Sequence, residues 1–211
     1  MLFDVAPARY VDVAALFVET GGMYWWVPGV DPWDESRDAR RYAGPHPVVA
    51  HPPCSRWCRL AGLVEARWGH TRGEDGGCFA HALHCVRTYG GVLEHPAFSD
   101  AFHAFRLPIP KTGEGWYRGA CGGASCYVEQ GRYGHVAKKA TWLYVHGLPR
   151  LPQLRFGHDP DARSKALVSW CGNHVSSGER RPRVGKAAAS RTTEEFREVL
   201  LALARSARKT A

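Results

Sequence analysis

The sequence contains no apolar run that approaches the roughly 18 residues needed to cross a bilayer. Its N-terminus also lacks the basic start, apolar stretch and small-residue cleavage site of a secretory signal. The seven cysteines are an odd number, which does not suit a framework of paired disulfides. We therefore expect a cytoplasmic protein without membrane contact, whose thiols serve packing, metal ligation or nucleophilic chemistry.

The length and charge of the chain narrow its class further. Its 211 residues suit one α/β domain with a substantial buried core. A net charge of +8 and eight tryptophans favour a polyanionic partner such as nucleic acid, although a solubilising surface is the alternative. A polyanionic partner is therefore the expectation at this point, and the oligomeric state is open.

Two short apolar stretches, 47–50 and 92–94, are typical of buried strands, and the pattern within 78–87 indicates a helix between them. Such a strand–helix–strand unit predicts parallel strands joined by a right-handed crossover. The apolar face of the helix consists of Phe79, Ala82, Leu83 and Val86.

Other segments give weaker signals. Residues 11–18 suit a strand or a short helix, 34–43 a short helix, and 141–145 a strand. The glycine-rich stretch 108–126 reads as a surface loop or small insertion. A last helix should begin near Thr192, where Thr192 and Glu195 fit a capping box. Its apolar face would consist of Phe196, Val199, Leu200 and Leu203.

Each of the two predicted parallel strands ends at a proline corner that carries one reactive side chain. Cys54 follows Pro52-Pro53, and Glu94 precedes His95-Pro96. Because parallel strands place their carboxyl ends on one edge of a sheet, both side chains should emerge on the same rim, where ligands bind in open α/β sheets. The prolines fix φ near −65° and stiffen the corner.

A thiol and a carboxylate on one rim suit the activation of carbon 5 of a pyrimidine. A thiolate that adds to carbon 6 breaks the aromaticity of the ring and turns carbon 5 into a nucleophile. A carboxyl group on ring nitrogen 3 stabilises the charge that accumulates. Arg56 and Arg59 follow Cys54 closely and would favour the thiolate. An inert, buried thiol and a surface carboxylate are the alternatives.

These residues carry a family resemblance. Pro52-Pro53-Cys54 resembles the Pro-Cys nucleophile motif of DNA cytosine-carbon-5 methyltransferases, and Leu93-Glu94-His95-Pro96 resembles their base-contacting glutamate motif. The loop 16–22 resembles their glycine-rich cofactor loop, and 130–132 their Gln-x-Arg motif. Segments 133–135, 139–141 and 148–149 resemble short phage and prophage members, for which the location would be the host cytoplasm.

The resemblance implies an α/β fold with a Rossmann-like, mostly parallel methyltransferase-type sheet, helices on both faces and little or no target-recognition domain. Residues 1–150 would form the catalytic domain, and the basic segment and helix of 151–211 would complete it. The enzyme would flip its target base out of the duplex. Because the chain lacks a long segment that could read several bases through a groove, its partner would be DNA bound with low sequence specificity, or a pyrimidine nucleotide. The implied catalytic residues are Cys54, Glu94 and Arg132. The implied cofactor-binding residues are Phe17, Gly21, Gly22, Asp31, Asp38 and Pro52, with Asp34 as an alternative to Asp31, and the implied substrate-binding residues are Ser55, Arg56, Gln130 and Lys139.

The transferred group stays open. Glu19 stands where the family has its first glycine, and a carboxylate there would repel that of S-adenosylmethionine. The alternatives are a methyltransferase with S-adenosylmethionine, related carbon-5 chemistry without it, such as hydroxymethyl or hypermodification transfer, and a non-catalytic DNA-binding remnant. No metal is expected in catalysis. A structural zinc on Cys121, Cys126, Cys171 and His174 is a further open alternative.

Overall fold

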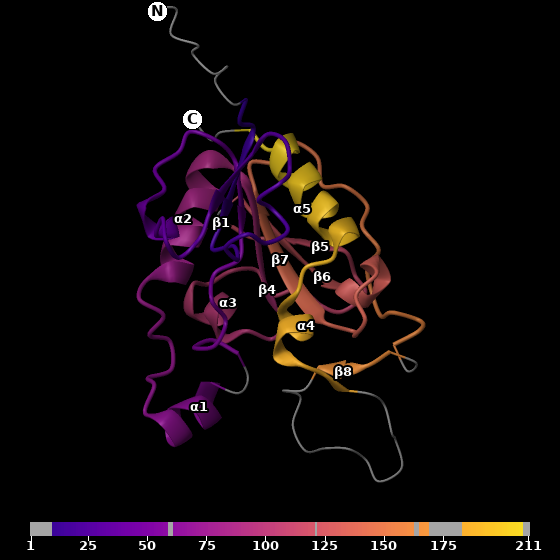
Figure 1. The fold of residues 1–211 in the computed structure, drawn as a ribbon. Helices are drawn as coiled ribbons and strands as arrows, with labels where there is room; N and C mark the ends of the chain where they lie inside the picture. The colour runs from indigo at the N-terminus through magenta and orange to yellow at the C-terminus, as the bar shows by residue number, and fades with distance from the viewer. Residues whose placement is uncertain (1–9, 59–60, 121, 163–164, 169–182, 209–211) are drawn as a thin grey trace, which may run out of the picture.

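The computed structural model describes residues 10–58, 61–120, 122–162, 165–168 and 183–208. Its centre is a seven-stranded mixed sheet with helices on both faces, an α/β architecture (Figure 1). None of the helices in these segments is long and apolar enough to cross a membrane. The strands of the sheet are β1 (Val13–Leu16), β2 (Val30–Trp33), β3 (Val48–Ala50), β4 (Gly91–Pro96), β5 (Trp116–Arg118), β6 (Ala124–Glu129) and β7 (Ala140–His146).

The helical segments and a small second sheet complete the fold. The α-helices are α1 (Ala61–Trp68), α2 (Cys78–Tyr89), α3 (Asp100–Ala104), α4 (Lys186–Ser190) and α5 (Glu194–Ser206). Two 3₁₀ turns, η1 (Ala39–Arg41) and η2 (Gln130–Tyr133), lie in connections. Strands β8 (Leu167–Val168) and β9 (Arg183–Val184) pair in parallel outside the main sheet.

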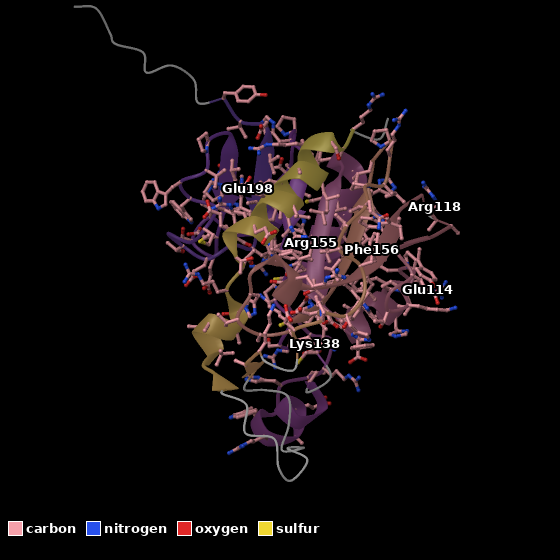
Figure 2. The ribbon with its side chains drawn as sticks, turned by 90° about the vertical axis from the view of Figure 1, so that its right-hand side faces the viewer. Glu114, Arg118, Lys138, Arg155, Phe156 and Glu198 are labelled. Carbon is pink, nitrogen blue, oxygen red and sulfur yellow. The ribbon has the colours of Figure 1, made fainter. Side chains whose placement is uncertain are left out.

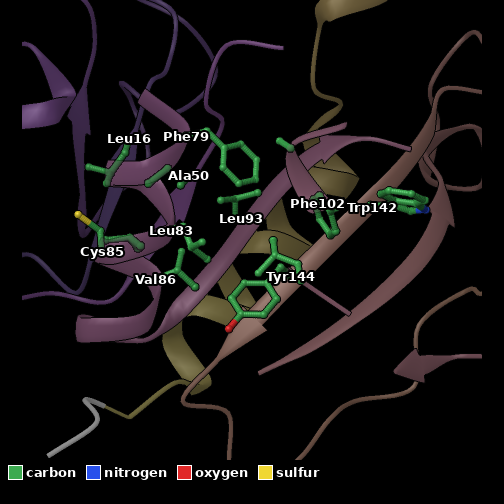
Figure 3. Packing of buried hydrophobic residues seen from close by; sticks show 14 of the residues in the cluster. Leu16, Ala50, Phe79, Leu83, Cys85, Val86, Leu93, Phe102, Trp142 and Tyr144 are labelled. Atoms are coloured by element: carbon green, nitrogen blue, oxygen red, sulfur yellow. The ribbon is translucent and has the colours of Figure 1, made fainter. Parts of the chain in front are cut away.

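Side chains alternate between the two faces of the main sheet, as the period of a strand requires. On one face Leu16, Ala50 and Leu93 pack with α2 and α3, and Figure 3 shows this cluster with Phe79 and Trp142. On the other face the alternate residues of the same strands pack against α5. The predicted apolar faces of both helices are therefore confirmed, because Phe79 and Phe196 are fully buried.

Strand pairing changes from parallel to antiparallel at the centre of the sheet. The order of strands is β2-β1-β3-β4-β7-β6-β5. The pairs β2–β1, β1–β3 and β3–β4 are parallel, which confirms the parallel pair predicted for 47–50 and 92–94, but β4–β7, β7–β6 and β6–β5 are antiparallel. The expectation of a mostly parallel sheet is not supported. Residues 130–139 between β6 and β7 are fewer than the dozen or so that a parallel crossover needs.

Three local predictions also need correction. The stretch 108–126 is not merely a loop, because it supplies β5 and the start of β6 on one edge of the sheet. Within 34–43 the structure has only the short turn η1 instead of a helix. The cap of α5 is Thr193, whose side chain accepts from the Phe196 amide, and not Thr192. The many glycines in 108–126 made that stretch look like a loop. The two adjacent threonines at 192–193 are nearly equivalent as caps, so the sequence pattern did not distinguish them.

The strand directions bring five strand ends to one edge. Strands β1, β2, β3 and β4 run in one direction, and β6 runs the same way because two antiparallel steps separate it from β4. The chain also leaves β1 toward β2 on one side and returns to β3 on the other. Such a switch point opens a crevice at the carboxyl ends of the strands, which is where ligands bind in α/β sheets.

Gly91 permits the close pairing of the two strands that carry the predicted reactive residues. Its φ is +126°, and a Cβ built on it would lie 2.0 Å from the carbonyl oxygen of Val48 in β3. We expect Gly91→Ala to lower the free energy of unfolding by at least about 2 kcal/mol, since both the overlap and the backbone conformation are unfavourable. Chemical denaturation would measure this change.

A matched control is Gly62→Ala in α1, where a Cβ meets nothing within 4 Å. That change should leave stability unaltered or raise it by about 0.5–1 kcal/mol, the helix preference of alanine over glycine. Equal stability of the two variants would contradict the role assigned to Gly91.

Candidate active site

Glu94 is the centre of a hydrogen-bonded group at the carboxyl edge of the sheet. His51, directly after β3, places Nδ1 3.0 Å from Glu94 Oε2. Gln130, directly after β6, donates from Nε2 to Glu94 Oε1 at 3.1 Å and to the Thr141 hydroxyl at 2.9 Å. The side chains of His51 and Glu94 are only 14% and 12% exposed. Both oxygens of a largely buried carboxylate are therefore held by donors from neighbouring strands.

The donors keep this carboxylate ionised. Burial by itself would raise the pKa of Glu94, because it disfavours the charged form. The hydrogen bond from His51 and the charges of His51 and Lys139 oppose burial and bring the pKa of Glu94 below its usual value. Glu94 is consequently a carboxylate at neutral pH and only accepts hydrogen bonds.

Tyr24 contacts the ring nitrogen of His51 that does not face Glu94. The Tyr24 hydroxyl lies 2.8 Å from His51 Nε2. Since Glu94 only accepts, His51 donates to it from Nδ1. Burial raises the pKa of Tyr24 far above its usual value, and Glu94 adds to this, so the hydroxyl keeps its proton. Tyr24, His51 and Glu94 thus form one chain of hydrogen bonds.

Cys54 lies next to this group but is not activated in the resting protein. It is partly exposed, three residues after His51. Burial raises the pKa of Cys54 to about 11, with Cys58 and Glu94 acting in the same direction and Lys139 in the opposite one. The sequence-based expectation of an arginine-activated thiolate is therefore wrong for this state. Arg59 lies outside the described residues, and Arg56 is not among the groups that perturb Cys54.

Lys139 is a cation that acts on both reactive residues. Its ammonium donates to the backbone carbonyls of Ser190 and Arg191 at 3.0 and 2.9 Å. Burial lowers the pKa of Lys139, whereas Glu94 and Cys54 raise it. Its backbone φ of +40° is unusual for a residue other than glycine and holds this side chain in a strained turn before β7. The predicted substrate-binding role of Lys139 is consistent with this position beside Cys54 and Glu94.

The other residues predicted beside Cys54 occupy different positions. Arg132 lies in η2, but its guanidinium donates to the backbone carbonyl of Phe156. Figure 2 labels Phe156 and its neighbour Arg155, and Phe156 packs against the buried cluster that contains α5. Pro52 is buried, Ser55 is exposed, and the buried Nη1 atom of Arg56 has no hydrogen-bond partner among the described residues. The structure thus places Gln130 in contact with Glu94, whereas the Arg132 side chain contacts Phe156 instead.

A cavity of about 1610 Å³ lies at the switch point between β1 and β3. The predicted cofactor residues Phe17, Gly21 and Gly22 line it. The remaining residues of the lining that matter for the chemistry are Glu19, Tyr24, His51 and Glu94. The chain of hydrogen bonds therefore connects this cavity with the edge of the sheet that carries Glu94.

The carboxylates predicted to bind the cofactor's ribose are occupied within the chain. Asp31 accepts from the Trp33 indole at 2.7 Å and from Arg37 at 2.6 Å. Asp34 is buried, and hydrogen bonds from Thr20 and then Ser36 lower its pKa to about 2. The third of these residues, Asp38, pairs with Arg40.

The loop after β1 also differs from a cofactor cradle. Between β1 and β2 the chain forms turns and no helix, so no helix N-terminus faces the cavity from this loop. A Cβ on Gly22 would lie 2.9 Å from the Glu19 carbonyl, so the turn itself requires this glycine. Glu19 adds a negative charge to the lining. These residues do not fit S-adenosylmethionine.

The zinc alternative receives no support from the described residues. Cys121, Cys171 and His174 lie outside them. Cys126 is fully buried in β6, and burial raises its pKa well above the usual value. No group of three or more metal-ligating side chains occurs in the part of the chain that the structure describes.

Sequence reasoning gave no role to His51, Tyr24 or Thr141. The available signal for His51 was its place directly after a predicted strand, at the same edge as Glu94. Tyr24 gave no such signal, because it lies among several aromatic residues of a turn-rich segment. Thr141 joins the group only because β7 reverses direction beside β4.

The raised pKa of Cys54 predicts slow alkylation near neutral pH. Since only the thiolate reacts, the rate of Cys54 modification by iodoacetamide should rise about tenfold per pH unit from pH 7 toward the pKa of about 11. Peptide mass spectrometry would follow Cys54 separately from the other thiols, with Cys54→Ser as the blank. A rate that levels off near pH 7 would show an activated thiolate instead.

The contact with His51 should set the ionisation of Glu94. We expect His51→Gln to raise the pKa of Glu94, because the hydrogen bond and the electrostatic effect of His51 are lost while the burial stays. In the wild type the folded-state pKa lies below the unfolded one, so Glu94 contributes stability at neutral pH that is lost as the pH falls through the folded-state value. The variant should lose part of that stability already at neutral pH.

Carbon-13 NMR of the glutamate carboxyls would measure the Glu94 pKa in both proteins. His84→Gln is the control, since His84 is exposed on α2. An unchanged pKa in His51→Gln would show that His51 does not control the charge of Glu94.

The chain has no match among protein-family models, curated proteins or solved structures. The likeness of the Cys54 and Glu94 segments to methyltransferase motifs therefore stays a prediction. What this site can do follows from the placement of Cys54, Glu94 and their neighbours.

Proposed function

We propose that this protein modifies carbon 5 of a pyrimidine base in DNA through a covalent adduct with Cys54. The carrying observation is the pair of neighbouring parallel strand ends that present a thiol and a buried, ionised carboxylate at one edge. Hydrogen bonds from His51 and Gln130 hold the carboxylate in one orientation. Preorganised polar groups of this kind are what a reaction with developing charge requires.

The proposed reaction has four steps. The Cys54 thiol loses its proton to solvent, and the thiolate pair forms the bond from sulfur to carbon 6. The π pair of the C5=C6 bond moves onto carbon 5, in conjugation with the group on carbon 4. Carbon 5 takes up an electrophile, whose donor keeps the electron pair of the broken bond. Loss of the original proton from carbon 5 to a base then restores the double bond and expels the thiolate.

The environment of Cys54 suits a thiolate that forms only with substrate. At rest the thiol is protonated, since burial raises its pKa to about 11. Lys139 is the cation that favours the thiolate in this environment. Arg56 lies two residues after Cys54 and has a buried nitrogen without a partner among the described residues. A bound nucleotide that engages these cations and the base would complete the site.

We assign the sheet to a variant of the Rossmann-like arrangement of methyltransferases. The support is the switch point between β1 and β3, with a cavity at the carboxyl ends of the strands. The antiparallel half, β7-β6-β5, departs from a simple doubly wound sheet. Its β6–β7 connection supplies Gln130, from the segment that resembles the family's Gln-x-Arg motif, and Lys139, from a segment that resembles the short phage members.

DNA is the proposed partner because of the charge of the chain. The formal net charge is +8, and cations such as Lys139 lie beside the thiol and carboxylate. Phosphate neutralisation by such groups gives binding that weakens as salt rises. A free pyrimidine nucleotide is the smaller substrate that the same site would accept.

Two alternatives have specific support. The misfit of the cavity to S-adenosylmethionine favours carbon-5 chemistry with another one-carbon or larger electrophile. The protonated resting state of Cys54 favours a non-catalytic DNA-binding protein. The two differ in one property, since only a catalyst adds sulfur to carbon 6.

Hydrogen exchange at carbon 5 tests the addition step without any group donor. In D₂O a thiolate adduct makes carbon 5 basic, so it takes up deuterium and returns the base with one mass unit more. We expect exchange in oligonucleotides incubated with the wild type, and none with Cys54→Ala, by mass spectrometry of the released nucleosides. Glu94→Gln should slow the exchange by about 10²-fold or more, since it removes the charge on the base contact.

Single-stranded, duplex and mononucleotide forms of cytosine and uracil substrates complete the experiment. Lys111→Gln, on an exposed segment away from the site, is the matched control and should exchange like the wild type. Absence of exchange on every substrate would sink the covalent proposal and leave the non-catalytic one.

A further inference from the structure

Glu94 presents hydrogen-bond acceptors, and no donor, to whatever occupies the site. Its two oxygens already accept from His51 and Gln130, and each retains a second lone pair. The Tyr24 hydroxyl lies at the other ring nitrogen of His51, Nε2, and keeps its own proton.

The amide of Gln130 reinforces this pattern. Its Nε2 hydrogens point at Glu94 and at the Thr141 hydroxyl, which in turn donates to the Lys139 carbonyl. Turning the amide over would place its oxygen against the Glu94 carboxylate, which is repulsive. An ionised Glu94 thus satisfies the donors of both His51 and Gln130.

Pyrimidine bases differ at the atom that such a carboxylate would contact. Ring nitrogen 3 of uracil carries a hydrogen and donates, whereas nitrogen 3 of cytosine is an acceptor. Cytosine would therefore face a carboxylate with a lone pair unless it brought an additional proton. A buried polar contact that cannot be made is a strong discriminator, because desolvated groups are left unpaired.

The positive charge of Lys139 also favours uracil over cytosine. Lys139 acts electrostatically on both Cys54 and Glu94, and two of its three hydrogens are used by backbone carbonyls. A cation beside the ring favours the carbonyl on carbon 4 of uracil over the amino group of cytosine. It also stabilises the enolate oxygen that forms there when sulfur adds to carbon 6.

We propose that the target is a 2,4-dioxopyrimidine of the uracil type, whose N3–H donates to Glu94 while Cys54 adds to carbon 6. This specificity rests on the proposed covalent function. In the adduct the π pair of C5=C6 moves through carbon 4 onto its oxygen, N3 keeps its hydrogen, and no proton passes to the base from the protein. Glu94 orients the ring, and Tyr24 is a positioning residue that acts through His51.

The test compares matched oligonucleotides that carry one deoxyuridine or one deoxycytidine at the same position. Exchange of the carbon-5 hydrogen in D₂O is measured for each and divided by the exchange that a free thiol, 2-mercaptoethanol, produces in the same oligonucleotide. We expect a normalised rate at least about tenfold higher for uracil, the factor that corresponds to one pKa unit. An equal or higher normalised rate for cytosine would overturn the proposal and leave covalent catalysis intact. No exchange on either base would instead refute the covalent function.

Variants of the hydrogen-bond chain separate specificity from folding. His51→Gln should lower the uracil-to-cytosine ratio, because Glu94 then takes up a proton more readily and can donate to cytosine. Tyr24→Phe should change the ratio in the same direction, and His84→Gln should leave it unchanged. A purely structural role of His51 would lower both rates equally and keep the ratio constant, which would contradict the proposal.

The pH profile supplies an independent readout. Lower pH should raise exchange on cytosine relative to uracil in the wild type, and this rise should begin at higher pH in His51→Gln. The titratable and charged groups that act within this region are Tyr24, His51, Cys54, Cys58, Glu94, His95, Lys139, Arg197 and Glu198. A ratio independent of pH in both proteins would contradict control by Glu94.

Discussion

The buried charge of Glu94 is the constraint on which the rest of this site depends. A carboxylate removed from water is costly unless donors and positive groups compensate for the lost hydration. Here the compensation comes from His51 after β3 and Gln130 after β6, with Tyr24 and Thr141 behind them. Loss of one donor would leave a buried charge unpaired. The network therefore fixes the relative positions of several strand ends as well as the protonation of its centre.

The reversal of the sheet beside β4 makes that network possible. With β7 antiparallel to β4, the following antiparallel step returns β6 to the direction of β4. The carboxyl end of β6 then meets those of β3 and β4, and Gln130 reaches Glu94. A fully parallel sheet would have needed a long crossover at this point. The short connection through η2 also places Lys139 beside Cys54.

The two reactive residues are tuned in opposite ways by the same environment. Burial raises the pKa of Cys54 and would raise that of Glu94, but only Glu94 has donors that reverse the effect. The negative charge on Glu94 further disfavours a thiolate nearby. Lys139 opposes this and links the two groups. The resting site therefore has an ionised Glu94 and a protonated Cys54. In the proposed reaction the Cys54 thiolate forms only when a bound substrate changes these electrostatic interactions.

The sequence by itself determined the parallel pair β3–β4, the apolar faces of α2 and α5, and the common edge of Cys54 and Glu94. These follow from local periodicity and from the rule that parallel strands end together. Only the tertiary structure decided the direction of β7, the strands within 108–126, and the partners of Glu94. Residues 24, 51, 130 and 141 meet through pairings between distant segments, which leave no local pattern. The ionisation of Cys54 and Glu94 likewise depends on burial and on those partners, and neither can be read from the residues beside them in the chain.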